Sequence, residues 1–236
     1  MKNTPFFTAF TGAFVAALTL SIAGAQPSAQ TTSPPPAAPP PAALPFAPLV
    51  ATMPSLPIVD PANELKGAAL IGALRKGGFV LYMRHSETGT VTEKCDASNL
   101  SAIGEQNARN VGAALRELKI PIGVVRSSQP CRCADTARLL GLGNVEITED
   151  LNPSAPRPGF DIGAARSKRL NEEPTAGTNT ILVSHLHGSR KKEEWAHLEL
   201  GEIIVFKPQG DSPAVPVARV RVAEWMALKG LDKSVP

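Results

Sequence analysis

The sequence predicts an α/β domain built as a three-layer α/β/α sandwich around a mostly parallel central sheet. Short apolar runs of strand length alternate with longer amphipathic segments through residues 60–236, the pattern expected when helices connect parallel strands. Two of the apolar runs end at a histidine, His85 and His185. Polar residues at strand ends are typical of open α/β sheets, whose ligand sites lie beyond the carboxyl ends of the strands.

The first 25 residues predict a signal peptide. Lys2 gives the start a positive charge, an apolar stretch covers 10–22, and Ala23-Gly24-Ala25 resembles a cleavage site. The apolar stretch is short for a membrane span, so a retained anchor is the less favoured alternative. We therefore expect a periplasmic or secreted protein that begins near Gln26 and has no stable membrane insertion after cleavage.

Residues 26–59 predict a disordered linker, because Pro, Ala, Ser and Thr dominate and such a segment buries little apolar area. Residues 60–236 have the length of one domain with a substantial core. The net charge is +3 with no long basic run, so nucleic acid is not an expected partner.

The first half of the domain begins with a predicted helix over 61–74, which Gly77-Gly78 ends. A strand over 79–83 follows. Residues 101–118 predict an amphipathic helix with apolar residues at steps of three and four, and Ser101 is a suitable N-cap.

The remaining elements follow from similar patterns. Gly141 ends one predicted helix, and the last two strands are expected to form an antiparallel pair. The predicted elements are strands over 122–127, 145–148, 178–184, 202–206 and 215–222, helices over 131–140 and 162–170, and a loop over 153–159.

Three cysteines are present, Cys95, Cys131 and Cys133. In an oxidising compartment two of them can form a disulfide and leave the third free. Cys131 and Cys133 are too close in sequence to bridge easily on a helix, so we expect Cys95 to pair with one of them. No ligand quartet at zinc-binding spacing is present.

Three strand ends deliver polar side chains that point to phosphate chemistry. Arg84 and His85 follow one strand, the segment from Ser127 to Arg132 follows another, and His185 follows a third. The planar guanidinium of arginine donates two parallel hydrogen bonds to phosphate, and a neutral imidazole can attack phosphorus. Converging strand ends would place two imidazoles and two guanidiniums in one site.

From about Gly77 to Trp225 the chain resembles the histidine phosphatase superfamily, also called the phosphoglycerate mutase-like family. The order and spacing of several motifs carry the resemblance together. They are Arg84-His85-Ser86-Glu87-Thr88, Leu100-Ser101 with Gly104 and Ala108, Ser127-Ser128 through Arg132 to Thr136-Ala137, Leu182-Val183-Ser184-His185, and Gly201-Glu202-Ile203-Ile204-Val205-Phe206.

The resemblance implies phosphomonoester hydrolysis with His85 as the nucleophile that becomes phosphohistidine. Arg84, Arg132 and His185 would bind the phosphoryl oxygens, with no metal or other cofactor. The expected periplasmic or extracellular location alone suggests a small-molecule or cell-envelope phosphate ester as substrate. Two departures stand out: Ser86 replaces the family's glycine, and Leu186-His187 follows the second histidine.

The general acid is left open among Glu149, Asp150 and Glu87, for each of which a solvated carboxylate is the alternative. A non-catalytic phosphate-binding domain of the same fold is the second hypothesis. A sugar-phosphate mutase is less favoured, because an exported enzyme would not meet the cytosolic pool.

Overall fold

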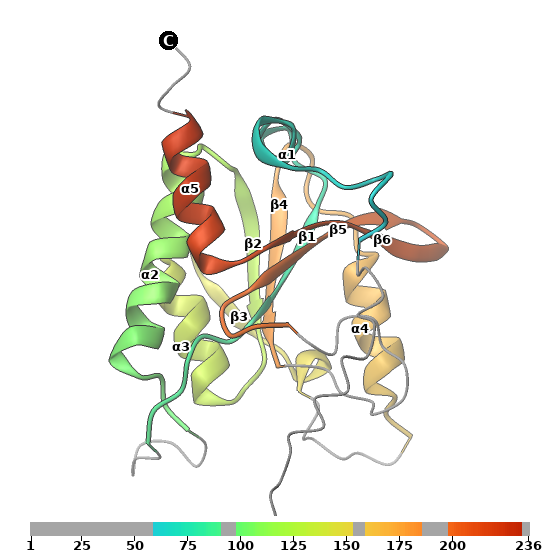
Figure 1. The fold of residues 1–236 in the computed structure, drawn as a ribbon. Coiled ribbons are helices and arrows are strands. Elements are labelled where there is room, and N and C mark those ends of the chain that lie inside the picture. The colour runs from blue at the N-terminus through green and yellow to red at the C-terminus, as the bar shows by residue number, and fades with distance from the viewer. Residues whose placement is uncertain (1–58, 91–97, 153–158, 186–197, 233–236) are drawn as a thin grey trace, which may run out of the picture. The chain divides into compact units, whose positions relative to one another are not determined.

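The computed structural model describes residues 59–90, 98–152, 159–185 and 198–232 (Figure 1). The predicted signal peptide and all of the predicted linker except Val59 lie outside these residues. Among the described residues, no helix has both the length and the apolar composition needed to cross a membrane.

The six strands form one sheet with the order β3-β2-β4-β1-β5-β6. The strands β3, β2, β4 and β1 run parallel to one another, whereas β5 is antiparallel to β1 and β6 to β5. This arrangement confirms the predicted fold class. The strands are β1 (Val80–Arg84), β2 (Ile122–Ser127), β3 (Val145–Ile147), β4 (Asn179–Ser184), β5 (Ile203–Gln209) and β6 (Ser212–Val220).

Helices cover both faces of this sheet (Figure 1). Alternate strand residues point to opposite faces, so β1, β4 and β5 each contribute to two apolar clusters. The larger cluster joins one face to α1, α2, α3 and α5, and the smaller joins the other face to η1, α4 and Leu198. The helices are α1 (Gly67–Lys76), α2 (Ala102–Glu117), α3 (Cys131–Leu140), η1 (Glu149–Leu151), α4 (Ile162–Leu170) and α5 (Val222–Asp232).

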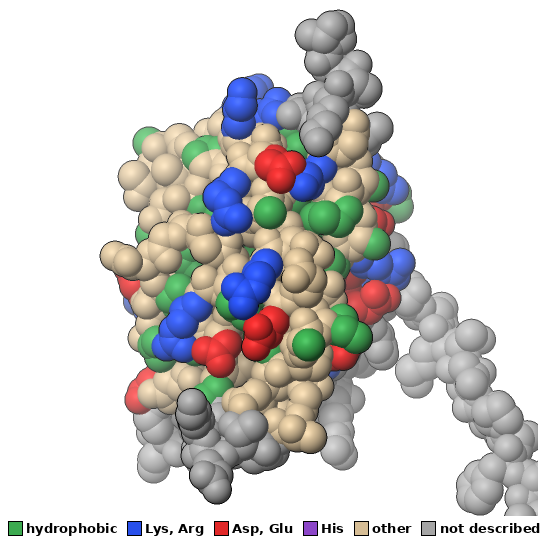
Figure 2. Space-filling model, turned by 90° about the vertical axis from the view of Figure 1, so that its left-hand side faces the viewer, with side chains coloured by type: hydrophobic (Ala, Val, Ile, Leu, Met, Phe, Trp, Pro, Cys, Tyr) green, Lys and Arg blue, Asp and Glu red, His purple; other side chains and the backbone are tan. Residues whose placement is uncertain are grey.

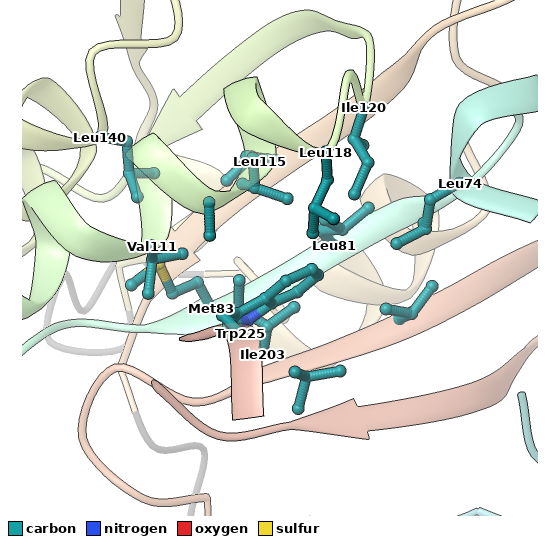
Figure 3. Close-up of a cluster of buried hydrophobic side chains, with 14 of the residues drawn as sticks. Leu74, Leu81, Met83, Val111, Leu115, Leu118, Ile120, Leu140, Ile203 and Trp225 are labelled. Atoms are coloured by element: carbon teal, nitrogen blue, oxygen red, sulfur yellow. The ribbon is translucent and has the colours of Figure 1, made fainter. Parts of the chain in front are cut away.

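Figure 3 shows the larger cluster, in which the indole of Trp225 lies beside Met83 and Ile203. Met83 and Ile203 come from neighbouring strands, and Leu115 reaches the cluster from α2. All four side chains are fully buried. Burial of such side chains contributes about 1.5–3 kcal/mol each, so this cluster holds the helices against the sheet.

Helix α1 begins later than predicted, at Gly67 instead of residue 61. The backbone N–H of Leu65 donates to the carbonyl of Val217 in β6, and Asp60 caps a turn through the N–H of Ala62. Both contacts hold the segment before Gly67 out of the helix. The predicted end is confirmed, because Gly77 adopts a φ of 79° after Lys76.

The C-terminal helix α5 contradicts the predicted extension of the last strand to Val222. Strand β6 ends at Val220, and α5 then carries Trp225 and Leu228 into the larger cluster. The predicted bounds of α3, β2 and α4 agree with the structure, and Ser101 caps α2 as expected.

Figure 2 shows the helical face of the domain, where basic and acidic side chains are interspersed. Arg109 pairs with Glu105 along α2, and Lys229 of α5 pairs with Glu117 at 2.8 Å. Surface pairs of this kind contribute little to stability, so the apolar clusters carry the fold.

Candidate active site

The register of the parallel strands brings three predicted strand ends to one edge of the sheet. Arg84 is opposite Ser184, and Ser127 is opposite Val183. The backbone N–H of His85 donates to the carbonyl of Ser184 at 2.9 Å. The two histidine rings therefore meet, with centroids 5.5 Å apart in an edge-to-face arrangement.

His85 is held in one tautomer by its own backbone neighbour. Its side chain is 7% exposed, and Nδ1 lies 2.8 Å from the carbonyl oxygen of Ser86. A carbonyl only accepts, so Nδ1 carries the proton and Nε2 keeps its lone pair. Among the described residues, Nε2 has no hydrogen-bond partner. The ring therefore presents a nucleophilic nitrogen.

The surroundings of His85 keep it neutral. The pKa of His85 is lowered from 6.5 to about 4, chiefly by burial; the hydrogen bond to the Ser86 carbonyl opposes this shift, and the positive charges of Arg132 and Arg84 add to it. At neutral pH the imidazole is therefore neutral. This is the form that can attack an electrophilic phosphorus.

His185 adopts the opposite tautomer. Arg132 Nη2 lies 3.2 Å from His185 Nδ1, and a guanidinium can only donate, so Nδ1 is the acceptor. The proton is then on Nε2, which lies 3.3 Å from Ser128 Oγ and 3.4 Å from Cys133 Sγ. The hydroxyl of Tyr82 donates to the backbone oxygen of His185 at 2.9 Å and fixes the residue's position.

Arg84 has a buried donor available for an anion. Its Nη1 donates to the carbonyl of Leu198 at 2.7 Å, but Nε is buried with no partner among the described residues. Burial lowers the pKa of Arg84. An unpaired buried guanidinium N–H is costly, and an anion would satisfy it.

Helix α3 ties Arg132 to the loop that carries the nucleophile. Thr136 Oγ1 donates to the carbonyl of Arg132 at 2.6 Å and accepts from the backbone N–H of Ser86 at 3.0 Å. Thr136 is fully buried, so this link between α3 and the loop is shielded from water.

The structure tests part of the predicted disulfide pairing. Cys131 is disulfide-bonded, whereas Cys133 is free and fully buried. Burial raises the pKa of the Cys133 thiol to about 12, so it stays protonated beside His185. Cys95 lies outside the described residues.

The segment before β5 supports the first motif from the other side. Gly201 N–H donates to the carbonyl of His85 at 3.1 Å, and the N–H of Arg84 donates to the carbonyl of Glu202 at 3.0 Å. The carboxylate of Glu202 is buried and pairs with Arg219. This partly buried pair fixes the backbone that positions Arg84 and His85.

The three candidate acids have different environments. Asp150 accepts from Arg169 Nη2 at 2.6 Å. Glu87 accepts from the hydroxyl of Ser101 at 3.0 Å, beside the start of α2. Glu149 is exposed. The structure therefore leaves the choice among the three open.

Of the two departures from the family pattern, Ser86 and Leu186-His187, only the first lies among the described residues. Ser86 is 1% exposed, and its Oγ is buried with no partner among the described residues. The Ser86 Oγ lies 3.6 Å from the position that a Cβ atom added at Gly201 would occupy. Leu186-His187 lies outside the described residues.

Sequence reasoning did not select Ser128, Cys133 or Tyr82 as site residues. Ser128 is part of a quoted motif, and Cys133 follows Arg132 directly, but their contacts with His185 depend on the register between β2 and β4. In the described part of the chain, no group of three or more His, Cys, Asp or Glu side chains is placed to hold a metal ion.

Comparison with known proteins agrees with this geometry. The family model of the histidine phosphatase superfamily (branch 1) matches residues 80–152, which run from β1 to the end of η1 and contain Arg84, His85 and Arg132. This segment is therefore similar to that superfamily over about a third of the chain. No curated protein matches the chain by sequence.

Two solved structures resemble the chain at low identity. The protein histidine phosphatase SixA complexed with tungstate is 17% identical, with 61% of this chain and 97% of that chain covered and a TM-score of 0.48. A mutant phosphoserine phosphatase from Entamoeba histolytica in complex with phosphoserine is 15% identical, with 62% and 98% covered and a TM-score of 0.42.

Proposed function

We propose that this protein hydrolyses phosphate monoesters through a phosphohistidine on His85. The observation that carries the proposal is a buried, neutral imidazole whose Nδ1–H is held by the Ser86 carbonyl, with Nε2 unoccupied and two guanidiniums nearby. The match of residues 80–152 to the histidine phosphatase superfamily model supports it.

The reaction proceeds in two displacements. His85 Nε2 forms a bond to phosphorus as the bond between phosphorus and the ester oxygen breaks, and the departing oxygen takes up a proton to leave as an alcohol. Water then attacks phosphorus, the N–P bond breaks, and phosphate leaves with neutral His85 restored. The Ser86 carbonyl holds Nδ1–H and stabilises the positive charge that develops on the ring.

Arg84 and Arg132 are proposed to bind the phosphoryl oxygens with His185. Charge spreads over these oxygens during transfer, so fixed donors act on the transition state more than on the bound ester. The buried, unpaired Nε of Arg84 supports this role. The proposal includes no metal or other cofactor, so a chelator should leave the activity unchanged.

The direct test is release of phosphate from an aryl phosphate by the full chain, by His85→Ala and by Arg84→Gln. We expect no turnover for His85→Ala and a loss of roughly 100-fold for Arg84→Gln, by analogy with removal of one oxyanion donor. Equal rates for wild type and His85→Ala would overturn the proposal. Thermal melts of each variant check that it is folded.

A non-catalytic phosphate-binding domain is the second candidate. It is favoured because two of the three candidate acids already have hydrogen-bond partners, Asp150 with Arg169 and Glu87 with the hydroxyl of Ser101. A phosphatase without a general acid would still hydrolyse esters with good leaving groups, so the first proposal predicts hydrolysis of aryl phosphates and slow or absent hydrolysis of alkyl phosphates. Binding of vanadate with no turnover on any aryl ester would select this second function.

We also propose that the protein is exported to the periplasm or outside the cell, because the sequence of residues 1–25 predicts a signal peptide. The expected substrate is then a small-molecule or envelope phosphate ester. Cell fractionation and N-terminal sequencing test this: a mature chain that begins near Gln26 outside the cytoplasm is expected, and a full-length cytoplasmic chain would contradict it.

A further inference from the structure

We propose that His185 takes up one proton when a phosphoryl dianion binds, and that Ser128 is the positioning residue that directs this proton to Nδ1. The inference rests on the proposed function, because it takes the anion site to be the one formed by Arg132 and the two histidines. It concerns binding alone and requires no turnover.

The first step is the resting state of His185. Arg132 Nη2 donates to Nδ1 at 3.2 Å, so in the free protein this nitrogen is an acceptor. An oxygen of a bound dianion is also an acceptor. Two acceptors repel, so an anion on Arg132 can contact His185 only if Nδ1 gains a proton.

The second step is the change in charge. In the free protein the guanidinium of Arg132 disfavours a positive imidazole beside it. A bound dianion offsets that charge and adds attraction for an imidazolium. Binding therefore favours protonation of His185, and Nδ1–H can then donate to the anion as a charge-assisted hydrogen bond.

The third step is the role of Ser128. Its Oγ lies 3.3 Å from Nε2, and the residue is fully buried at the end of β2, where its N–H donates to the carbonyl of Val183 at 3.0 Å. The hydroxyl accepts the Nε2 proton in both states. The second proton must then go to Nδ1, the nitrogen that faces Arg132.

The other described groups around the ring do not compete for this proton. Cys133 contributes a neutral thiol, and the hydroxyl of Tyr82 donates to the backbone oxygen of His185. His85 is a further titratable neighbour, at 5.5 Å between centroids, and its Nδ1 is already protonated. Of these four neighbours, Arg132 is the one with an ionised side chain.

Calorimetry with sulfate tests the proposal, because sulfate is a tetrahedral dianion that does not titrate near neutral pH. Binding to the full chain is measured at roughly pH 7.5 in buffers of different ionisation enthalpy, and the slope of the binding enthalpy gives the protons taken up. We expect an uptake that approaches one proton per sulfate for wild type.

Four variants assign the proton. His185→Gln keeps an amide donor but cannot titrate, so its uptake should vanish, whereas His85→Gln should keep it. Ser128→Ala should move the pH at which uptake is half-complete down by roughly one unit or more, since a hydrogen bond to a charged group is lost. Ser128→Thr restores the hydroxyl and should restore the wild-type value.

The outcomes separate this inference from the proposed function. Sulfate binding without uptake, or uptake that disappears in His85→Gln and persists in His185→Gln, overturns the inference and leaves the phosphatase proposal standing. If Ser128→Ala and Ser128→Thr both behave as wild type, Ser128 has no positioning role. Sulfate binding that neither Arg132→Gln nor His185→Gln weakens would overturn the anion site itself.

Discussion

At the scale of single residues, the site depends on which nitrogen of each histidine carries a proton. The Ser86 carbonyl accepts from His85 Nδ1–H and so keeps the His85 proton on Nδ1, whereas Arg132 donates to His185 Nδ1 and so leaves the His185 proton on Nε2. The two rings thus have opposite tautomers although they are neighbours. One presents a lone pair where a nucleophile is needed, and the other offers an acceptor that an arriving anion must convert to a donor.

The low pKa of His85 predicts a pH dependence of stability. Between pH 6.5 and about 4 the unfolded chain binds a proton that the folded chain excludes, so stability falls as the pH falls through this window. The gap between the two pKa values corresponds to roughly 3 kcal/mol. Above pH 6.5 this contribution is fully present.

Urea unfolding of wild type and His85→Gln from pH 7 to pH 4 measures the effect. The difference in unfolding free energy between the two proteins should change by about 3 kcal/mol over this range, with wild type losing more. Parallel curves would show that the folded state protonates His85 as easily as the unfolded chain does.

Ser86 gives a second prediction at this scale. Its buried hydroxyl has no partner among the described residues, so Ser86→Ala should raise the unfolding free energy by about 1 kcal/mol. Ser184 is equally buried but donates to the carbonyl of Leu151 at 2.6 Å, and Ser184→Ala is the matched control. That control should lose about 1 kcal/mol. Changes of the same sign in both variants would contradict the prediction.

At the scale of elements, local signals fixed most boundaries and long-range contacts fixed the exceptions. Ser101 caps α2 and Gly141 ends α3 with a φ of 62°, and both features are readable from sequence. The start of α1 was wrong because Leu65 binds β6, a contact far away in the chain. Helix α5 was missed because its residues are apolar enough to suit a strand, and packing of Trp225 decides its structure.

The features of the candidate site also divide into those that the sequence predicts and those that depend on long-range contacts. That Arg84, His85, Arg132 and His185 meet was predictable, because parallel strands end at a common edge. The contacts with Ser128 were not predictable, since they depend on strand register. The acid stayed open because sequence does not show which carboxylates are paired.

Two glycines of α2 test how this helix supports the site. A Cβ at Gly104 would lie 2.0 Å from the carbonyl oxygen of Glu87, and one at Gly112 would lie 1.8 Å from that of Leu140. Either alanine must displace backbone, so each should cost roughly 3 kcal/mol of stability. Only Gly104→Ala displaces the loop next to His85, so it alone should also lower kcat/KM, by roughly tenfold or more.

Thermal melts and kinetics on the folded variants separate the two effects. Gly72 of α1 has nothing within 4 Å of its added Cβ, so Gly72→Ala is the control and should stabilise by up to about 1 kcal/mol. A loss of kcat/KM in Gly112→Ala equal to that in Gly104→Ala would show that general loosening of α2 accounts for the change.

At the scale of the whole molecule, the sheet combines two kinds of pairing with separate roles. The parallel strands β2, β4 and β1 deliver the reactive side chains at one edge. The antiparallel strands β5 and β6 bring in Glu202 and Arg219, whose partly buried pair holds the backbone behind Arg84 and His85. Site and support thus come from opposite sides of β1.

This arrangement predicts that the domain works without the preceding segment. Residues 51–236 form one unit of the chain, and every described contact of the site lies among its residues 59–232. A chain that begins at Ala51 should melt within about 2 °C of the full chain, because a change of 1 kcal/mol shifts Tm by about 2–4 °C at this size. Its kcat/KM on an aryl phosphate should stay within about twofold, since no site contact is lost.

A chain that begins at Gly67 is the contrasting control. It also loses Leu65 and its hydrogen bond to Val217, so it should melt at a lower temperature. If the chain from Ala51 failed to fold, or lost activity while folded, the first fifty residues would be part of the working enzyme.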